Sequence, residues 1–386
     1  MSKPTPIKIA GAMTGTSCDG MDLVVISFSG NQMSTSHFSS VEYPSHLRKR
    51  VLDFQTPGST QTAKKWCELD RDLGIWYGEV FKELLKTKKI DAISNHGQTL
   101  AHFPKSSPFG TTLQLGDPFI IAQMTGLTTI TGHRHGDMAG GGQGAPLAPI
   151  FHKKLVDSLF KKTSSVAIHN LGGISNFSYF RRGECQMAFD TGPGNCLMDL
   201  ATEIHTHGKM NFDRGGAFAS QGKVDADAIT KILRDPYIRL KPPKSTGRDD
   251  FHITFLKKIT HTTGINLIST ATALTIETIV DAYERFILKN QLPLDCILFI
   301  GGGAQNHFLI TSIKKRLKNI KIVTAEEIGI NAQAIEAQAF SYMGFLTLKG
   351  LALGGTWTGA KADSPPGLIV PGKNWNSLLR KLHTHT

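Results

Sequence analysis

Several features that define large protein classes are missing from this chain of 386 residues. No apolar run approaches the ~20 residues that a bilayer-spanning helix needs, so we expect neither a membrane protein nor a membrane partner. The five cysteines are widely spaced and form no C-x-x-C pair, which argues against a disulfide framework and a zinc site. The first residues also lack the apolar segment and cleavage site of a secretory signal. These absences predict a cytoplasmic protein with reduced, mostly buried thiols.

Acidic residues are outnumbered, because 43 lysines and arginines oppose 31 aspartates and glutamates and give a net charge of +12. The basic residues nevertheless form no long run and no stripe interleaved with aromatic residues, so the sequence does not predict nucleic-acid binding. Short basic clusters at 46–50, 86–89 and 314–316 are interpreted as solvated faces of helices. A basic surface of this kind attracts anionic substrates such as nucleotides and acidic sugars.

The N-terminal region contains neither the G-x-x-x-x-G-K-[ST] P-loop nor the G-x-G-x-x-G dinucleotide motif. It contains instead two apolar strands joined by a Gly/Thr/Ser turn with one acid, IKIAGAMTGTSCDGMDLVVISF at 7–28. Such a hairpin exposes backbone N–H groups, hydroxyls and a carboxylate at its tip. These groups suit the terminal phosphates of a nucleotide and their metal ion, although an ordinary tight hairpin has the same pattern.

The chain is long enough for two or three domains. Its first part predicts three strands, a helix over 62–86 and a strand over 90–94. The second part begins in a similar way, with strands over 165–169, 177–180 and 186–189, which indicates an internal repeat of architecture. Further expected elements are a strand over 296–300 and helices over 150–160, 196–205, 224–233, 252–263, 269–288, 306–317 and 331–348, with no predicted element after 353.

A Gly/Pro-rich segment at 131–149 separates the two parts and is either a mobile loop or a junction. We place the domain boundary there, with domains at 1–134 and 135–386. Four glycine-rich turns follow strands, at 15–20, 172–173, 192–194 and 301–303. If the two halves face each other, the hairpins can hold phosphates from either side while the triple glycine lies against a base or ribose.

Eight motifs together resemble those of the anhydro-N-acetylmuramic acid kinases, over about residues 7 to 348. They are, in order, GAMTGTSCDGMD, SNHGQTLAHFP, LQLGDP, GGGQGAPLAP, NLGGISNFS, FDTGPGNCLMD, PPKSTGRDDF and FIGGGAQN. The resemblance implies an α/β protein with two ribonuclease H-like (actin-like ATPase) domains flanking an ATP-binding cleft, and a homodimer. It also implies ATP and Mg²⁺ as cofactors and 1,6-anhydro-N-acetylmuramic acid as substrate. Water opens the anhydro ring while O6 is phosphorylated, which gives N-acetylmuramic acid 6-phosphate and ADP.

The resemblance also implies which residues bind the nucleotide. The phosphate hairpin is formed by Gly15, Thr16, Ser17, Cys18, Asp19, Gly20, Met21 and Asp22, the second phosphate loop by Gly172 and Gly173, and the adenosine loop by Gly301, Gly302, Gly303 and Asn306. Asp19 is the candidate to hold Mg²⁺ through water, because magnesium keeps several waters and takes few protein carboxylates.

Asp190 is the candidate catalytic base, because water that attacks an anomeric carbon must lose a proton to a group within hydrogen-bond reach. The alternative is an Asx-turn residue that caps the following helix. Sugar contacts implied by the resemblance are His96, Asp117, Arg134 and Glu336. A guanidinium at Arg134 suits the lactyl carboxylate of muramic acid.

The alternatives to these sugar contacts are that Arg134 is a surface arginine on a mobile loop and that His96 is a structural histidine. Glu336 lies in an apolar helical pattern, where an unpaired buried acid would be costly.

The sequence departs from the family pattern at His133 and Gly136, where a phenylalanine and a second arginine are expected. Two other functions stay open: an ATP-dependent kinase for another sugar or acid, and a non-catalytic nucleotide-switch module of the same fold.

Overall fold

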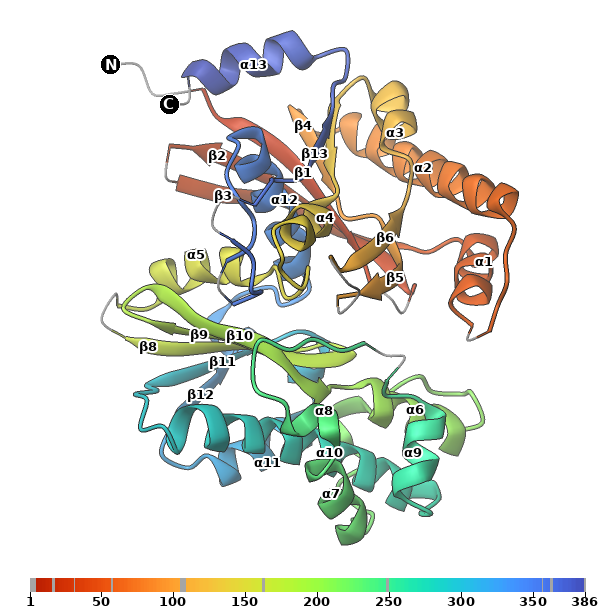
Figure 1. Cartoon of the computed structure of the whole chain (residues 1–386), viewed down its shortest axis with the longest axis vertical. Coiled ribbons are helices and arrows are strands. Elements are labelled where there is room, and N and C mark those ends of the chain that lie inside the picture. Colours follow the sequence, from red (N-terminus) through yellow and green to blue (C-terminus); the bar gives the residue numbers. More distant parts are fainter. Residues whose placement is uncertain are drawn as a thin grey trace. The chain divides into compact units, whose positions relative to one another are not determined.

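The computed structural model describes residues 5–15, 18–30, 32–56, 58–104, 109–161, 164–247, 250–355, 357–361 and 364–384. The chain forms two compact units, of which unit 1 comprises Met1–Phe151 and Gln333–Thr386 and unit 2 comprises His152–Ala332 (Figure 1). This division differs from the predicted boundary between residues 134 and 135. The chain leaves unit 1 later and returns to it near the end, because its last segments complete the sheet and core of unit 1.

Unit 1 is built on a six-stranded sheet of order β13-β7-β4-β1-β2-β3. Its strands are β1 (Ile7–Thr14), β2 (Gly20–Ser29), β3 (Gln32–Glu42), β4 (Ala92–Asn95), β7 (Thr128–Thr131) and β13 (Leu368–Val370), with β5 (Gln98–Phe103) and β6 (Thr111–Leu115) as a separate pair. Its helices are α1 (Ser45–Gln55), α2 (Ala63–Leu85), α3 (Pro118–Thr125), α4 (His133–Ala139), α12 (Ala334–Leu348) and α13 (Trp375–Thr384), and α5 (Pro149–Leu159) begins here and continues into unit 2.

The period of two in β1 and β2 sends alternate side chains into two different core layers. Leu23 and Val25 pack in the cluster that contains Leu73 of α2. Val24 and Ile26 pack in the cluster that contains residues of α12. The two apolar strands predicted around the turn are therefore confirmed, and each face of the sheet is covered by helix.

A glycine in β1 allows α12 to approach the sheet closely. A Cβ on Gly11 would lie 2.4 Å from the Ala337 carbonyl oxygen and 2.6 Å from the Ser341 Cβ. The Ser341 hydroxyl donates to the Ile9 carbonyl at 3.0 Å. Because of this packing, α12 is fixed against the strand that leads into the phosphate hairpin.

Unit 2 is built on a five-stranded sheet of order β10-β9-β8-β11-β12. Its strands are β8 (Ser165–Leu171), β9 (Ile174–Arg181), β10 (Glu184–Pro193), β11 (Cys296–Ile300) and β12 (Lys321–Thr324). Its helices are α6 (Cys196–His205), α7 (Ala226–Leu233), α8 (Pro236–Arg239), α9 (Ile253–Ile259), α10 (Gly264–Tyr283) and α11 (His307–Arg316), with 3-10 turns η1 (Arg214–Gly216), η3 (Gly302–Gln305) and η4 (Glu326–Ile328) and a π-helical turn η2 (Glu284–Leu288).

The two sheets share one topology, in which β3-β2-β1-β4-β7 corresponds to β10-β9-β8-β11-β12. In each sheet two antiparallel pairs are followed by two parallel ones. This is the strand order of a ribonuclease H-like domain, so the predicted α/β fold class and internal repeat are confirmed. In each unit the hairpin tip and the carboxyl ends of the parallel strands share one edge of the sheet, which is where open α/β sheets bind ligands.

Some elements differ from the prediction. The tail after 353, for which no element is predicted, contains β13 and α13. β13 pairs with β7, and Leu378 of α13 is 1% exposed in the core of unit 1. The Gly/Pro-rich segment at 131–149, predicted as a mobile loop or a junction, contains helix α4. Local sequence is a weak guide to these elements, because tertiary pairing and burial stabilise them.

Helix α2 confirms the helix expected over 62–86. All five cysteines are free, but only Cys18 and Cys296 are buried, Cys185 and Cys196 are half-buried and Cys67 is exposed. In the described part of the chain, no single helix meets the length and hydropathy required to cross a bilayer. The bent pair formed by α9 and the stretch Gly264–Leu288 meets the requirement only when both parts are counted together.

Candidate functional site

The tip of the β1–β2 hairpin is a tight turn with one carboxylate in solvent. Cys18 is fully buried with φ of 54°, and its N–H donates to the Gly15 carbonyl at 3.2 Å. The Asp19 side chain is 74% exposed and lies 3.7 Å from the Arg48 guanidinium. An exposed carboxylate beside a turn fits a magnesium ion that keeps most of its waters. Among the described residues, no three His, Cys, Asp or Glu side chains gather as a metal site.

The other residues predicted in this hairpin divide into two groups. Thr16 and Ser17 lie outside the described residues. Met21 is buried in the core of unit 1, and half-buried Asp22 accepts a hydrogen bond from Ser40 Oγ at 2.8 Å while burial raises the pKa of its carboxyl. The Met21 side chain therefore has a packing role. Nucleotide contacts by the residues of this hairpin stay predictions.

His96 and Arg134 are brought together at the carboxyl end of β4. Arg134 Nε donates to His96 Nε2 at 2.9 Å, and its Nη1 donates to the Gly144 carbonyl at 2.7 Å. Arg134 is therefore half-buried and hydrogen-bonded, not a free surface arginine. Burial, and then the neighbouring guanidinium, hold the pKa of His96 well below its usual range, so this imidazole is neutral. Among the described residues, its Nδ1 has no hydrogen-bond partner.

Glu336 lies in the first turn of α12, in the same unit as this pair. Phe340, one helical turn further on, contacts the His96 ring at a centroid distance of 4.5 Å and the His133 ring at 5.5 Å. Because residues four apart share a helix face, Glu336 is on the face of α12 that packs toward the two histidines.

Asp117 has a structural role in this geometry. Its Oδ1 accepts hydrogen bonds from the backbone N–H groups of Phe119 and Ile120, at 2.8 and 3.3 Å, and so caps α3. A cap of this kind stabilises a helix start by satisfying N–H groups that have no partner within the helix. As a sugar contact Asp117 remains a prediction.

The glycine-rich segment that ends at Gly144 is held by a buried carboxylate that the motif analysis did not select. Asp137 Oδ2 accepts from the Gly144 N–H at 2.7 Å, and its Oδ1 accepts from the Thr358 hydroxyl at 2.7 Å. A Cβ on Gly142 or Gly354 would lie 2.3 or 1.6 Å from this carboxylate. The segment is therefore fixed beside Arg134.

A cavity of about 310 Å³ lies along α4 and β6, with His135, Met138 and Thr112 among its lining residues.

In unit 2 the predicted second phosphate loop and adenosine loop lie side by side. A Cβ on Gly301 would lie 2.3 Å from Asn170 Oδ1, and one on Gly303 would lie 2.9 Å from Leu171 Cβ. Gly301 also has φ of 83°, which favours glycine. A Cβ on Gly302 would have no described atom within 4 Å. The space beside the middle glycine is therefore open.

Other predicted members of these loops have structural contacts. The carbonyls of Gly172 and Gly173 accept hydrogen bonds from the N–H groups of Asn195 and Gly194, both at 2.9 Å. These bonds tie the second phosphate loop to the start of α6. Asn306 is buried, and its Oδ1 accepts from the Leu309 N–H at 3.0 Å as the cap of α11. Direct nucleotide contacts by these residues stay predictions.

Asp190 occupies the end of a polar row across the sheet of unit 2. In the strand register Asp190 pairs with Asn176, Asn176 pairs with Asn170, and Asn170 pairs with Ile300. Laterally paired residues project from the same face. A bulge between Asp190 and Gly192 interrupts the register at this point, and bulges re-aim side chains next to active sites.

The Asp190 carboxylate is only 6% exposed. Its Oδ2 accepts a hydrogen bond from the Thr246 N–H at 2.9 Å. Asn195 occupies the N-cap position of α6, so the alternative in which Asp190 caps that helix does not describe the structure. The buried Asp190 is thus hydrogen-bonded to the Thr246 N–H and paired in strand register with Asn176, and its role as the base stays a prediction.

A family model for anhydro-N-acetylmuramic acid kinase matches residues 7–372. A relative of that name from Caldanaerobacter subterraneus subsp. tengcongensis is 36% identical over 365 residues, covering 89% of this chain and 91% of the relative. One from Coxiella burnetii is 35% identical over 378 residues, covering 95% and 98%. This chain belongs to the anhydro-N-acetylmuramic acid kinase family. Among solved structures, the activator of 2-hydroxyisocaproyl-CoA dehydratase from Clostridium difficile with bound ADPNP is similar with TM-score 0.41 and 11% identity, over 89% and 96% of the two chains.

The two departures from the pattern expected for anhydro-N-acetylmuramic acid kinases have a physical explanation in this chain. His133 is buried, contacts Phe340 and hydrogen-bonds Ser94 Oγ at 3.1 Å, so it fills an aromatic position. A Cβ on Gly136 would lie 2.1 Å from the Pro365 carbonyl oxygen. The segment after residue 364 occupies the space that a second arginine would need.

Residues that the motif analysis did not select complete these sites. They are Asn170 and Asn176 in the polar row, Asp137 beneath the glycine segment, and Tyr237, Lys244 and Thr246 around Asp190. Several stand inside the motifs NLGGISNFS and PPKSTGRDDF. Their presence in a motif was visible, but their roles depend on strand register and long-range hydrogen bonds.

Proposed function

We propose that this protein is an ATP-dependent kinase for 1,6-anhydro-N-acetylmuramic acid that couples phosphorylation to hydrolysis of the anhydro ring. Family membership over residues 7–372 supports the substrate and the reaction. The observation that carries the chemistry is the buried Asp190 carboxylate at the bulge of β10, beside the glycine loops of unit 2.

In the proposed reaction, Asp190 accepts a proton from water as the water oxygen bonds to C1 of the sugar. The bond between C1 and the bridging O6 breaks, O6 bonds to the γ-phosphorus of ATP, and ADP leaves with the electrons of the broken P–O bond. In-line transfer depends on positioning and on neutralising charge. The open space at Gly302 is suited to part of the nucleotide, and the β1–β2 hairpin is the element that we assign to its phosphates.

Asp19 is the residue we propose to hold Mg²⁺ through water, and a bound Mg²⁺ would neutralise phosphate charge. Arg48 lies 3.7 Å from the Asp19 carboxylate, so it is placed to exchange between this carboxylate and a phosphate oxygen. Sugar recognition is assigned to His96, Arg134 and Glu336. Neutral His96 accepts a hydrogen bond from Arg134 Nε at 2.9 Å and so orients the guanidinium, and Arg134 supplies charge for the lactyl carboxylate.

The proposal also includes a homodimer that acts in the cytoplasm, as the family implies. It predicts that light scattering of the purified protein gives twice the mass of the chain.

The test is incubation of the protein with Mg·ATP and the anhydro sugar in ¹⁸O-labelled water, followed by mass spectrometry. We expect phosphate on O6 and label at C1. Phosphorylation without label at C1 would exclude attack by water, and no phosphorylation of this sugar would favour a different substrate.

The variant Asp190→Asn is expected to bind ATP normally but to lose several orders of magnitude in kcat, because an amide cannot accept the proton. Nucleotide affinity is measured by calorimetry and turnover by ADP release. The matched control is Asp225→Asn, since Asp225 caps α7 in the same unit and has no part in the proposed reaction. Near-normal turnover of Asp190→Asn would remove this residue from the reaction.

A further inference from the structure

Residues 237–246, a neighbouring segment of unit 2, make three hydrogen bonds to Asp190. The Asp190 N–H donates to the Lys244 carbonyl at 3.2 Å. The Tyr237 hydroxyl donates to the Asp190 carbonyl at 2.8 Å, and the Thr246 N–H donates to Asp190 Oδ2 at 2.9 Å. The position of the carboxylate therefore depends on the shape of this segment.

The Lys244 side chain cross-links the segment from inside. Its Nζ donates to the carbonyls of Tyr237 and Ile238, both at 3.1 Å. The residue is only 4% exposed, and Nζ lies 4.7 Å from the centre of the Tyr237 ring and 5.5 Å from that of Phe189. Its ammonium is thus directed into the protein and is not available to a ligand in solvent.

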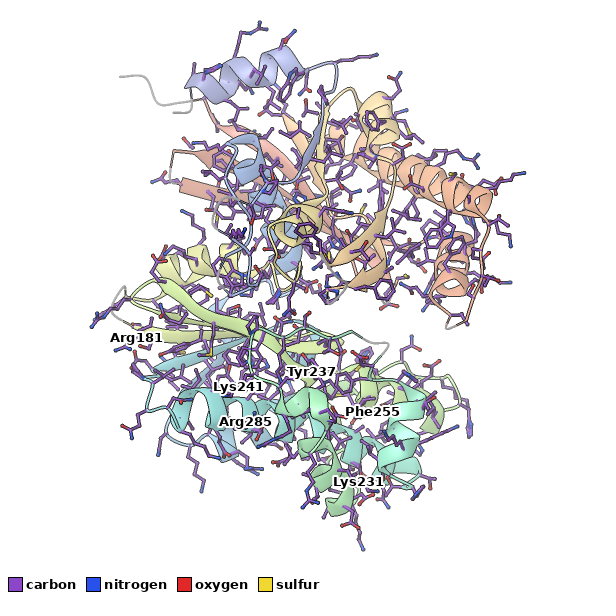
Figure 2. All side chains as sticks on the ribbon, viewed as in Figure 1. Arg181, Lys231, Tyr237, Lys241, Phe255 and Arg285 are labelled. Carbon is purple, nitrogen blue, oxygen red and sulfur yellow. The ribbon has the colours of Figure 1, made fainter. Side chains whose placement is uncertain are left out.

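A second cation fixes the same segment to the helical layer. Arg285, in the π-helical turn η2, donates to the Ile238 carbonyl at 2.9 Å and to the Arg239 carbonyl at 3.0 Å. Tyr237 and Arg285 both belong to unit 2 (Figure 2). Two buried or half-buried cations therefore converge on the last turn of α8.

The burial of this ammonium carries a free-energy cost. Burial lowers the pKa of Lys244 to about 8, with Arg285 adding to the effect and Asp281, Asp190 and Asp235 opposing it. A methionine would fill similar space without that cost. Packing alone therefore does not account for a lysine at this position.

We propose that Lys244 is a positioning residue that holds the Asp190 carboxylate in place by closing the 237–246 segment. The inference rests on the proposed role of Asp190 as the base. Lys244 acts through the backbone and through Tyr237, without contact to the substrate.

The test is Lys244→Met, which removes the donors and keeps an apolar side chain. We expect kcat to fall about 100-fold, as for a misplaced catalytic group, with the KM for ATP changed less than about twofold. A displaced segment weakens the hydrogen bond from the Thr246 N–H to Asp190 Oδ2, which favours the ionised carboxylate. The acid limb of the kcat–pH profile is therefore expected to move to higher pH.

The matched control is Lys231→Met. Lys231, also labelled in Figure 2, is exposed and donates to the Ile259 carbonyl at 3.1 Å, so its substitution removes a bond from a lysine to a carbonyl of the same unit without reaching Asp190. This variant should keep both kcat and the pH profile. A merely structural role for Lys244 would lower the melting temperature but leave the acid limb unchanged.

Three results overturn the inference. The first is a folded Lys244→Met enzyme with normal kcat and an unmoved acid limb. If Asp190→Asn is inactive, this result overturns the inference but leaves the proposed function intact. Near-normal turnover of Asp190→Asn defeats both. If Lys244→Met does not fold, Tyr237→Phe carries the test, because it deletes only the hydroxyl bonded to the Asp190 carbonyl. For Tyr237→Phe we expect kcat to fall about threefold to tenfold with little change in the KM for ATP, because Asp190 loses one of its bonds to the segment, and a normal kcat overturns the inference.

Discussion

His152 and His169 are buried, neutral imidazoles in unit 2. His152 Nδ1 hydrogen-bonds Ser178 Oγ at 3.0 Å. His169 hydrogen-bonds the Tyr283 hydroxyl at 3.0 Å and Ser175 Oγ at 2.7 Å. Ser175 follows closely after the glycine loop at 172–173. Burial lowers the pKa of each histidine to about 3. Each side chain supports the fold only in its neutral form.

This neutrality predicts a loss of stability in mild acid. Between about pH 6.5 and pH 3 the unfolded chain binds a proton at each of these histidines and the folded chain does not, so the free energy of unfolding falls as the pH falls. At pH 5 the loss is about 2 kcal/mol per histidine. Urea unfolding of His152→Gln should therefore show a weaker dependence on pH than the unchanged protein.

The matched control for this measurement is His46→Gln, because His46 is exposed. This variant should follow the pH dependence of the unchanged protein. Equal pH dependence in His152→Gln and His46→Gln would contradict the prediction.

At the scale of elements, the C-terminal part of the chain completes unit 1. Asn374 Oδ1 accepts from the Thr128 N–H at 2.8 Å, and its amide donates to the Asp91 carbonyl at 2.6 Å. The Lys381 ammonium pairs with the Asp91 carboxylate at 2.6 Å. Helix α13 is therefore tied to the ends of β4 and β7, the parallel strands beside β1.

We expect Leu378→Ala to lower the free energy of unfolding by about 2–5 kcal/mol, as for other large-to-small changes in a core. Leu378 is 1% exposed and belongs to the core cluster that includes Ile9 and Ile130. The measurement is chemical denaturation followed by circular dichroism. The control Leu351→Ala, at a side chain that is 50% exposed, should change little, and an equally small effect at Leu378 would contradict the assignment of α13 to this core.

At the scale of the whole molecule, two units of the same topology carry different chemistry. Unit 1 has the hairpin carboxylate and the His96–Arg134 pair. Unit 2 has Asp190 and the two glycine loops. The common fold supplies an equivalent sheet edge in each unit, and the side chains at that edge determine what each unit contributes.

The net charge of +12 predicts salt-dependent capture of the anionic substrates. Raising the salt concentration from about 20 mM to about 300 mM shortens the Debye length several-fold. KM for ATP and for the acidic sugar should therefore rise by roughly threefold to tenfold, with little change in kcat. Steady-state kinetics at both salt concentrations test this, and a KM independent of salt would show that the charge does not steer binding.

The sequence by itself determined the family, the repeat of two α/β halves and the main glycine turns. These depend on local patterns: strand alternation, glycine at strand ends and motifs read in order. Asp190 was singled out as the residue that could take a proton from water, and His96 and Arg134 were implied by the resemblance to the family.

Only the tertiary structure decided what holds these residues in place. The register that aligns Asp190 with Asn176 and Asn170, and the return of 333–386 to unit 1, join residues far apart in the chain. The bond from Thr246 to Asp190 and the ammonium of Lys244 depend on how one segment folds back on another. Long-range contacts of this kind leave no periodicity in the sequence, because they form through burial and hydrogen bonding after the local elements meet.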